Sequence, residues 1–359
     1  MIRVLVVDDL AVVRKFITYL LDSDPEIQVI GTAANGEEAV EEAKRKKPSV
    51  ITMDIHMPKM DGFEATRRIM EVQPTPIVIV SGSSTVKEAA TAFKAIEAGA
   101  LAVAPRPEGI GHPEHEAKAK ELIQTVKLMS EVKVVRRWLR PKREITPSVP
   151  QVGIEKTLTK IQMVAIGAST GGPIALQTVL SGLAKDFPVP VLIVQHIAVG
   201  FLEGLVDWLA QSTGFPVHIA TDGEHPRPGH VYVAPDGFHM VMKAGNRIAL
   251  TGEEPRDGLR PSVSHLFASV AKVFGKNAVG VLLTGMGKDG ADELKRMKDR
   301  GAITIAQDEE SSIVYGMPGE AVKLDAATFV LSIEKIPEVL EAMVKPTSPL
   351  MSTSIKNHL

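Results

Sequence analysis

The chain has 359 residues, a formal net charge of −2 and no cysteine. This length accommodates two domains of ordinary size, and the lack of cysteine excludes disulfides, thiolate metal sites and a cysteine nucleophile. Apolar residues make up 44% of the chain and charged residues 23%, which is typical of a globular protein. The near-neutral net charge argues against a dominant nucleic-acid-binding surface.

The sequence shows no signal for secretion or membrane insertion. The opening residues, MIRVLVVDDL, place two aspartates where a signal peptide needs an apolar stretch. The longest apolar candidate, 188–202, is interrupted by Gln195 and His196 and is too short to span a bilayer. We therefore expect a cytoplasmic protein without direct membrane insertion.

The first hundred or so residues alternate between short apolar runs and amphipathic stretches. Five runs are continuously apolar, as in strands buried on both faces of a sheet: VLVV (4–7), VIGTAA (29–34), VITMD (50–54), IVIVS (77–81) and ALAVA (100–104). Five βα units of this spacing predict a doubly wound parallel sheet. A last helix is expected from about Pro113 to Trp138, with apolar residues one or two turns apart.

A basic stretch with prolines follows this region. Its cationic residues crowd together: Arg136, Arg137, Arg140, Lys142 and Arg143. They could form a patch for nucleic acid or membrane, although such a run is more often a solvated helix end, and the prolines predict an exposed linker. We assign 1–125 to a first domain, 126–158 to the helix end and linker, 159–346 to a second domain and 347–359 to a disordered tail.

The second region again alternates strand-like and helical patterns. Its strand-like runs are MVAIGAS (163–169), VLIVQH (191–196), VYVAPD (231–236), AVGVLLT (278–284) and AITIAQD (302–308). Each run ends in a polar or glycine-rich turn, and the carboxyl ends of strands are where open α/β sheets bind ligands. The pattern predicts a second doubly wound α/β domain with a site at that edge.

Three aspartates follow strands in the first region. Asp8 and Asp9 come after the first strand, and Asp54 ends the third. Parallel neighbouring strands would bring the three carboxylates to one sheet edge, where they need a cation to stay ionised. Hard oxygen ligands favour Mg²⁺. Ser81 after the fourth strand and Arg106 after the fifth would lie at the same edge.

These motifs, with the MPKMDG turn, resemble the receiver domain of response regulators, a flavodoxin-like five-stranded fold, over about 1–125. The resemblance implies that Asp54 is the phosphoacceptor and that Asp8, Asp9 and Asp54 hold Mg²⁺. It also implies that Ser81 and Arg106 contact the phosphoryl group.

Two positions depart from the usual receiver pattern. Members usually have lysine where Arg106 stands, and arginine keeps the charge but has a longer, planar side chain. An aromatic residue often stands where this chain has Val103, and valine cannot act as a swinging aromatic switch. Activation is therefore expected to be transmitted differently here.

The second region contains GASTGG (167–172) between a strand and a helical run that begins near Pro173. Its glycines could hold a pyrophosphate at a helix N-terminus, its G-x-S-x-G pattern could be a nucleophile elbow, or the turn could be purely structural. The dinucleotide interpretation needs an acid at the end of the next strand. Gln195 and His196 stand there instead, which favours a hydrolase.

A serine nucleophile needs a base that is itself oriented by a third group. His196 ends a buried strand next to the strand of Ser169, and His239 is the next candidate. Asp289, in the glycine-rich turn LLTGMGKDG (282–290), could orient the base, could cap the following helix, or could do both. The order Ser, His, Asp differs from the α/β-hydrolase order, so the G-x-S-x-G match does not assign that fold.

Six motifs of the second region resemble the catalytic domain of the chemotaxis protein-glutamate methylesterase family, over about 160–345. They are GASTGG, VQH, VYVAPDGFHM, RPSVSHLFASVA, LLTGMGKDGA and YGMPGEA. The resemblance implies a nucleophilic Ser169, a base at His196 and an orienting Asp289. It also implies an oxyanion site near Met286 and Thr170, and an esterase without a cofactor.

The same resemblance implies partners and a control mechanism. The substrates would be glutamate methyl esters on chemoreceptors, with deamidation of selected glutamines as a second activity, and a chemotaxis histidine kinase would phosphorylate the receiver. The unphosphorylated receiver would cover the catalytic cleft. Two alternatives stay open: a receiver-controlled dinucleotide oxidoreductase, and a response regulator with a DNA-binding output.

Overall fold

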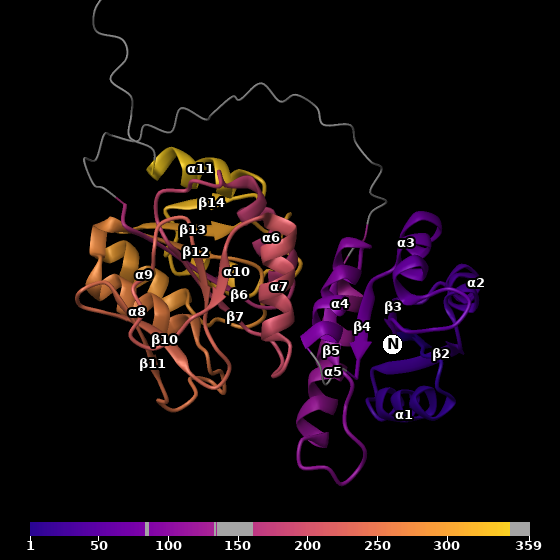
Figure 1. Cartoon of the computed structure of the whole chain (residues 1–359). Coiled ribbons are helices and arrows are strands. Elements are labelled where there is room, and N and C mark those ends of the chain that lie inside the picture. Colours follow the sequence, from indigo (N-terminus) through magenta and orange to yellow (C-terminus); the bar gives the residue numbers. More distant parts are fainter. Residues whose placement is uncertain (83–85, 133, 135–160, 345–359) are drawn as a thin grey trace, which may run out of the picture.

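The computed structural model describes residues 1–82, 86–132, 134 and 161–344, and these form two α/β lobes that lie side by side (Figure 1). Most of the predicted linker and the whole predicted tail lie outside the described residues. Within the described part of the chain, none of the helices combines the length and apolar character needed to cross a bilayer.

The N-terminal lobe, residues 1–131, alternates strands with helices. Its elements are β1 (Ile2–Val7), α1 (Ala11–Asp22), β2 (Ile27–Ala33), α2 (Gly36–Lys46), β3 (Val50–Met53), α3 (Gly62–Val72), β4 (Ile77–Ser81), α4 (Val86–Glu97), β5 (Ala102–Pro105) and α5 (His115–Glu131). The sheet has the order β2-β1-β3-β4-β5, and all of its strand pairs are parallel. This order is that of flavodoxin-like folds, so the predicted first fold is confirmed.

Alternate residues of each strand bury against opposite helix layers. In β1, Val4 and Val6 belong to the core under α1 and α5, whereas Leu5 and Val7 belong to the core under α2, α3 and α4. Because side chains alternate across a strand, a continuously apolar run supplies both cores at once. This is why the predicted strands lack a polar face.

Helix α5 is shorter than the sequence predicts. It ends at Glu131 rather than near Trp138, and Val132 after it has an extended backbone with ψ 122°. β-Branched residues lose side-chain freedom in a helix, and Val132 and Val134 follow one another closely at this point. The predicted helix was too long at its C-terminal end because the preference of these two valines for an extended backbone was not taken into account.

The C-terminal lobe, residues 161–344, is larger. Its elements are β6 (Met163–Ala168), α6 (Gly172–Gly182), β7 (Val191–Gln195), α7 (Leu202–Thr213), β8 (Val217–Ile219), β9 (Val231–Val233), β10 (His239–Lys243), β11 (Arg247–Thr251), α8 (Val263–Val273), η1 (Gly275–Asn277), β12 (Ala278–Leu282), α9 (Ala291–Asp299), β13 (Ile303–Gln307), α10 (Met317–Lys323), β14 (Phe329–Leu331) and α11 (Lys335–Val344). The main sheet has the order β14-β13-β12-β6-β7-β9-β8 and is parallel throughout. Strands β10 and β11 form a separate antiparallel hairpin.

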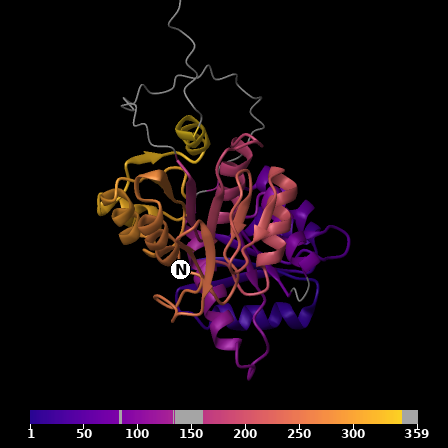
Figure 2. The same cartoon turned by 60° about the vertical axis from the view of Figure 1, so that its left-hand side comes forward.

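This sheet is covered on both faces, which confirms the second predicted α/β domain. Helices α6, α7 and α11 pack on one face, and α8, α9, α10 and the hairpin pack on the other. Figure 2 shows the strands of this sheet side by side, with the N-terminal lobe behind them. The chain runs from β6 outward to β7 and later returns to build β12, β13 and β14 on the other side of β6. The boundary between β12 and β6 is therefore a topological switch point, where such sheets bind ligands.

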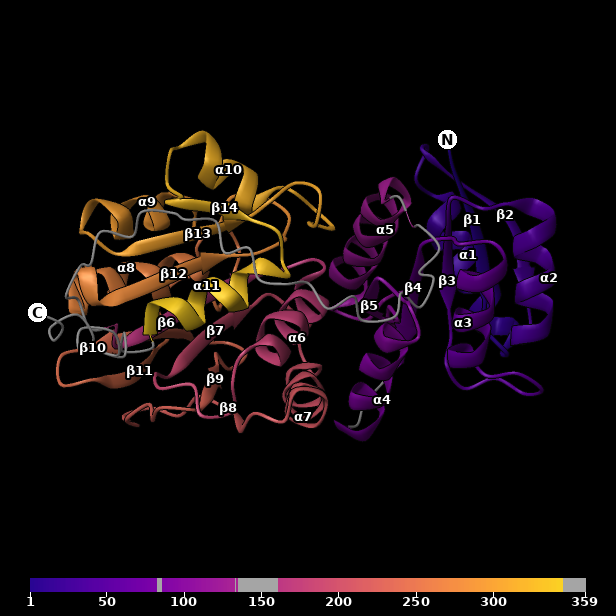
Figure 3. The same cartoon turned by 90° about the horizontal axis from the view of Figure 1, so that it is seen from above.

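The two lobes meet through α4 and α7, as the view from above shows (Figure 3). The rings of Phe93 and Trp208 stack with centroids 5.8 Å apart, and the Trp208 indole N–H donates to the Glu97 carboxylate at 2.9 Å. Phe93 and Trp208 are both almost fully buried. The interface therefore has an apolar centre that includes one satisfied polar contact.

Candidate active site

Ser169 stands directly after the central strand β6, at the switch point of the sheet. Its backbone N–H donates to the Thr284 carbonyl at 3.0 Å, and its own carbonyl accepts from the Gly172 N–H and from the Gln195 side-chain amide, both at 2.8 Å. Gly171 ends the turn with a left-handed φ of 79°, which favours glycine, and α6 begins at Gly172. The serine is thus held on a sharp strand-to-helix turn, as the sequence predicts.

His196 directly follows the neighbouring strand β7. The register pairs Ala168 with Gln195, and the His196 N–H donates to the Ala168 carbonyl at 3.0 Å. His196 and Ser169 therefore extend from adjacent strand ends into the same pocket. The predicted proximity of these two residues is present in the fold.

Asp289 lies in the loop that follows β12, on the other side of β6. One of its carboxylate oxygens, Oδ2, is 3.0 Å from Nε2 of His196. A carboxylate only accepts hydrogen bonds, so Nε2 carries the hydrogen and Nδ1 is the free nitrogen of the neutral ring. The predicted His–Asp pair therefore forms, and it leaves Nδ1 of His196 as the nitrogen that can accept a proton.

Asp289 is only 7% exposed, and its carboxylate is surrounded by donors. Besides His196, it accepts hydrogen bonds from the Ser262 hydroxyl at 2.8 Å, the Val263 N–H at 2.7 Å and the Ser264 N–H at 3.1 Å. Burial alone would raise the pKa of Asp289. The donors outweigh burial and hold this pKa well below its ordinary value, so the carboxylate stays ionised.

The loop from β12 to Asp289 approaches the serine closely. A Cβ at Gly285 would lie 2.7 Å from the Cβ of Ser169 and 2.4 Å from the sulfur of Met317, so glycine is required there. The Thr284 hydroxyl donates to the Thr170 carbonyl at 2.9 Å and accepts from the Val314 N–H at 2.9 Å. These contacts fix the loop against the turn that carries the serine. Thr284 was not among the residues singled out from the sequence.

His239, the alternative base, is fully buried away from this arrangement. Its Nε2 donates to the Glu254 carbonyl at 3.2 Å, and its Nδ1 accepts from the Ser262 N–H at 3.2 Å. With both ring nitrogens engaged, it has no nitrogen free for a serine proton. The geometry favours His196 as the base.

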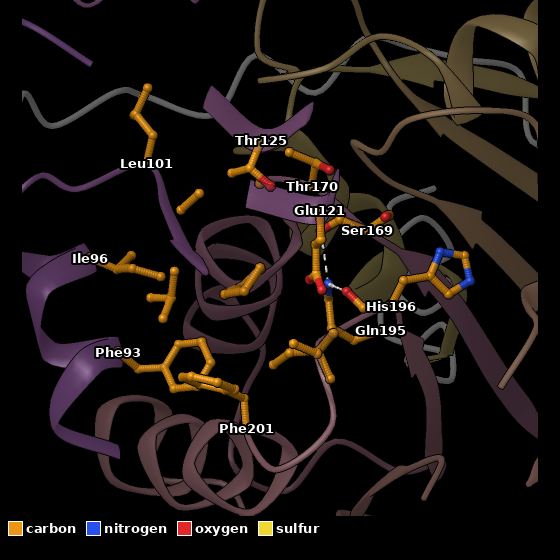
Figure 4. Close-up of a pocket in the computed structure, with 16 residues that line it drawn as sticks. Phe93, Ile96, Leu101, Glu121, Thr125, Ser169, Thr170, Gln195, His196 and Phe201 are labelled. Carbon is orange, nitrogen blue, oxygen red and sulfur yellow. Dashed lines mark hydrogen bonds between the residues drawn. The ribbon is translucent and has the colours of Figure 1, made fainter. Parts of the chain in front are cut away.

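The pocket at Ser169 is closed on one side by the N-terminal lobe (Figure 4). The C-terminal lobe contributes Ser169, Thr170, Gln195, His196 and Phe201, and the N-terminal lobe contributes Phe93, Ile96, Leu101, Val103, Glu121 and Thr125. In Figure 4 Glu121 and Thr125 extend from α5 toward the turn that carries the serine. Val103, the position that is often aromatic in receivers, is half-buried and lines this pocket.

The three predicted acidic ligands also come together. Carboxylate oxygens of Asp8, Asp9 and Asp54 lie within 4.8 Å of one another at the edge of the N-terminal sheet. Burial, together with the neighbouring charge of Asp54, raises the pKa of Asp8 to about 6, and burial also raises the pKa of Asp54. Burial and the repulsion between these carboxylates disfavour their ionised forms, and a bound cation would offset both effects.

Ser81 and Arg106 lie at the same edge. The Arg106 N–H donates to the Ser81 carbonyl at 2.8 Å, and the Arg106 guanidinium lies over Gly82, where a Cβ would meet Nη2 at 2.0 Å. Its positive charge lowers the pKa values of Asp8 and Asp54, although not enough to offset burial. The charge predicted for this position thus acts on the acidic cluster.

Comparisons with known proteins identify the family of each lobe. Residues 164–340 match the family model of the CheB methylesterase, and residues 4–108 match that of the response regulator receiver domain. The protein-glutamate methylesterase/protein-glutamine glutaminase of Nitrosospira multiformis is 58% identical, over 96% of this chain and 97% of that protein. The chain belongs to the CheB methylesterase family.

Other members of the CheB family match over similar lengths. The protein-glutamate methylesterase/protein-glutamine glutaminase 4 of Geobacter metallireducens is 56% identical over 96% of this chain and 99% of that protein. The crystal structure of the Thermotoga maritima CheB methylesterase catalytic domain matches with a TM-score of 0.50 and 37% identity, over 52% of this chain and 100% of that chain. The two alternative outputs, a dinucleotide oxidoreductase and a DNA-binding module, are not supported, because the second lobe matches a methylesterase.

Proposed function

We propose that this CheB family member is a phosphorylation-activated serine hydrolase that removes methyl groups from glutamate methyl esters on chemoreceptors. The observation that carries the proposal is the position of Ser169, His196 and Asp289 after three adjacent strands, with His196 hydrogen-bonded to a buried, ionised carboxylate. A nucleophile, a base and an orienting acid at one sheet edge are the components of a serine hydrolase.

The proposed reaction begins with Nδ1 of His196 taking the hydroxyl proton of Ser169. The serine oxygen attacks the γ-carbonyl carbon of the methylated glutamate, and the resulting imidazolium is stabilised by Asp289. His196 then donates its proton to the departing methoxide, so that methanol leaves and a glutamyl ester of Ser169 remains. Water, deprotonated by His196, hydrolyses this ester and restores the serine.

The negative oxygen of the tetrahedral intermediate needs hydrogen-bond donors. We assign this role to the backbone N–H groups of Thr170 and Met286, which flank the serine on the two contacting loops. Among the described residues none accepts a hydrogen bond from either group, so both are available. The Ser169 N–H, by contrast, already donates to Thr284. Preorganised donors of this kind are worth about 10²- to 10³-fold in kcat each.

The same residues would deamidate selected glutamines. A side-chain amide presents the same carbonyl carbon to Ser169, and ammonia replaces methanol as the leaving group once His196 protonates it. The relatives from Nitrosospira multiformis and Geobacter metallireducens are both named protein-glutamine glutaminases as well as methylesterases. No cofactor is needed for either reaction.

The acidic cluster of the N-terminal lobe fits Mg²⁺, because carboxylate oxygens of three aspartates lie within 4.8 Å of one another and hard oxygen ligands favour this cation. Asp8, Asp9 and Asp54 would hold the ion, which neutralises phosphate charge when it is bound. We propose that Asp54 accepts a phosphoryl group from a chemotaxis histidine kinase. Ser81 and Arg106 would then donate hydrogen bonds to the phosphoryl oxygens.

Phosphorylation would control access to Ser169. In the unphosphorylated chain, α4, β5 and α5 of the N-terminal lobe close the pocket that contains Ser169 and His196. A shift of Ser81 and Arg106 toward a phosphoryl group would move the ends of β4 and β5, which lead into the docked face. Such a switch biases an equilibrium and does not lock it.

The proposal is tested by measuring methanol release from methylated receptor with and without acetyl phosphate and Mg²⁺. We expect methanol release that the phosphodonor accelerates. Asp54→Asn should keep the basal rate and lose the acceleration, because the phosphoacceptor is gone while the triad is unchanged. Arg106→Lys should keep an acceleration, since it keeps the cation. An Asp54→Asn variant that is still stimulated would show that control does not pass through Asp54.

A second test concerns the docked face. Phe93→Ala removes the ring that stacks on Trp208, and Phe→Ala changes in buried sites cost about 3–5 kcal/mol. We expect the unphosphorylated rate to rise roughly 5-fold or more, since couplings between sites are typically about 1–3 kcal/mol. Phe63→Ala is the matched control, because Phe63 lies on α3 and does not line the pocket at Ser169, and it should leave the basal rate unchanged. Equal basal rates for wild type and Phe93→Ala would contradict the covering model.

A further inference from the structure

The Asp289 carboxylate is held by four donors, of which only one is the catalytic histidine. Its Oδ1 accepts from the Ser262 hydroxyl and the Ser264 N–H, and its Oδ2 accepts from the Val263 N–H and from His196. Three of the four donors come from the N-cap residue and the first two residues of α8. The N-terminal end of α8 therefore orients the Asp289 carboxylate and, with it, the position of Oδ2 beside His196.

Ser262 is the N-cap residue of α8, but it does not cap the helix in the usual way. An N-cap serine ordinarily accepts a hydrogen bond from a backbone N–H in the first turn of its own helix. Here Ser262 makes no such bond, and its hydroxyl donates to Asp289 instead. The first N–H groups of the helix also donate to Asp289, so the aspartate caps α8 from another loop. Ser262 is fully buried and does not line the pocket at Ser169.

His239 fixes the backbone of Ser262. Its Nδ1 accepts from the Ser262 N–H, its Nε2 donates to the Glu254 carbonyl, and its ring stacks on His265 with centroids 3.7 Å apart. Burial lowers the pKa of His239, which favours the neutral ring that this pair of hydrogen bonds requires. His239 thereby ties the loop between β11 and α8 to the hairpin at two points.

We infer that Ser262 and His239 form a clamp of positioning residues that holds the carboxylate of Asp289 in place and thereby fixes the orientation of His196 toward Ser169. The inference rests on the proposed serine-hydrolase function. Neither residue touches the substrate pocket, so the clamp acts through Asp289 on the reactivity of the serine and not on substrate binding.

The first test removes the hydroxyl of Ser262. Hydrogen bonds to charged groups are strong enough that Ser262→Ala should lower kcat for methanol release about 10-fold or more, with KM unchanged. The rate at which a fluorophosphonate labels Ser169 should fall by a similar factor. Ser262→Thr keeps the hydroxyl and should recover most of both rates. Ser269→Ala is the matched control, since Ser269 lies on the same helix and has partly buried hydrogen bonds to Leu266 and Met242 but, among the described residues, none to Asp289.

The second test separates the two nitrogens of His239. The side-chain oxygen of asparagine can replace Nδ1 as acceptor for the Ser262 N–H, whereas the amide of glutamine can replace only the Nε2 donor. His239→Asn should therefore retain more activity than His239→Gln. If His239 had a purely structural role, the two variants would differ only in stability. The rate of methanol release is therefore divided by the amount of Ser169 that fluorophosphonate labels, and the two variants are compared by this ratio.

A spectroscopic measurement follows the clamp directly. The proton between His196 and Asp289 should give a low-field imidazole resonance, identified by its loss in His196→Gln. The resonance should shift or broaden in Ser262→Ala and not in Ser269→Ala. If folded Ser262→Ala and His239→Gln both label at the wild-type rate with an unshifted resonance, the clamp is wrong. If the wild-type protein reacts with fluorophosphonate but releases no methanol from the receptor, the proposed substrate is wrong. The labelling rates of the variants still test the clamp in that case.

Discussion

Ser169→Ala is expected to lower kcat for methyl-ester hydrolysis by about 10⁴- to 10⁶-fold while leaving the fold intact, as loss of a triad nucleophile does in other serine hydrolases. The side chain contributes only its hydroxyl to the pocket, because the hydrogen bonds that shape the turn use the backbone N–H and carbonyl of Ser169. Alanine preserves those backbone bonds. The variant should therefore unfold at the same denaturant concentration as wild type.

The measurement is methanol release from methylated receptor under phosphorylating conditions, with fluorophosphonate labelling in parallel. Ser181→Ala is the matched control, because Ser181 is an exposed serine near the end of α6, the helix that follows the catalytic turn. It should hydrolyse and label at the wild-type rate. A folded Ser169→Ala variant with normal methanol release would mean that another group is the nucleophile.

The positions of these residues were predictable because strand ends are visible in the sequence. Ser169, His196 and Asp289 each follow a continuously apolar run closely, and parallel strands bring their carboxyl ends to one edge. Strand order was not predictable to the same degree. Nothing in the local pattern states that β12 returns to the side of β6 opposite β7, although this placement lets Asp289 reach His196. Their catalytic roles stay predictions until they are measured.

Long-range contacts explain most of what the sequence did not reveal. The hydroxyl of Ser262 meets Asp289 across 27 positions of the chain, so no short motif encodes the contact. Strands β8 and β14 have three residues each and lie outside the predicted runs, whereas β9 is equally short but belongs to the predicted run VYVAPD. The stacking of Phe93 on Trp208 depends on how the lobes dock, which no pattern within either lobe predicts.

The second large effect is expected from His196→Gln, which should reduce kcat nearly as much as Ser169→Ala. Glutamine offers no base for the serine proton, and Asp289 is left as a buried carboxylate with one donor fewer. His225→Gln is the matched control, because His225 is an exposed histidine of the same lobe whose Nδ1 lies 2.9 Å from the Asn246 carbonyl oxygen. The His225→Gln variant should leave kcat and KM unchanged. A loss of activity in this control would show that the lobe is sensitive to histidine replacement in general.

The double variant Ser169→Ala, His196→Gln decides whether the two residues work as one unit. If each lowered the barrier independently, the two losses in kcat would multiply, and the residual rate would fall far below that of either single variant. In a triad, removal of the nucleophile already makes the base useless, so the double variant should be no more than a few-fold slower than Ser169→Ala. The comparison requires a receptor assay sensitive enough to measure the slow single variants above the uncatalysed rate. Multiplying losses would show that His196 contributes to turnover by a route that does not pass through the serine, and the proposed proton transfer would have to be abandoned.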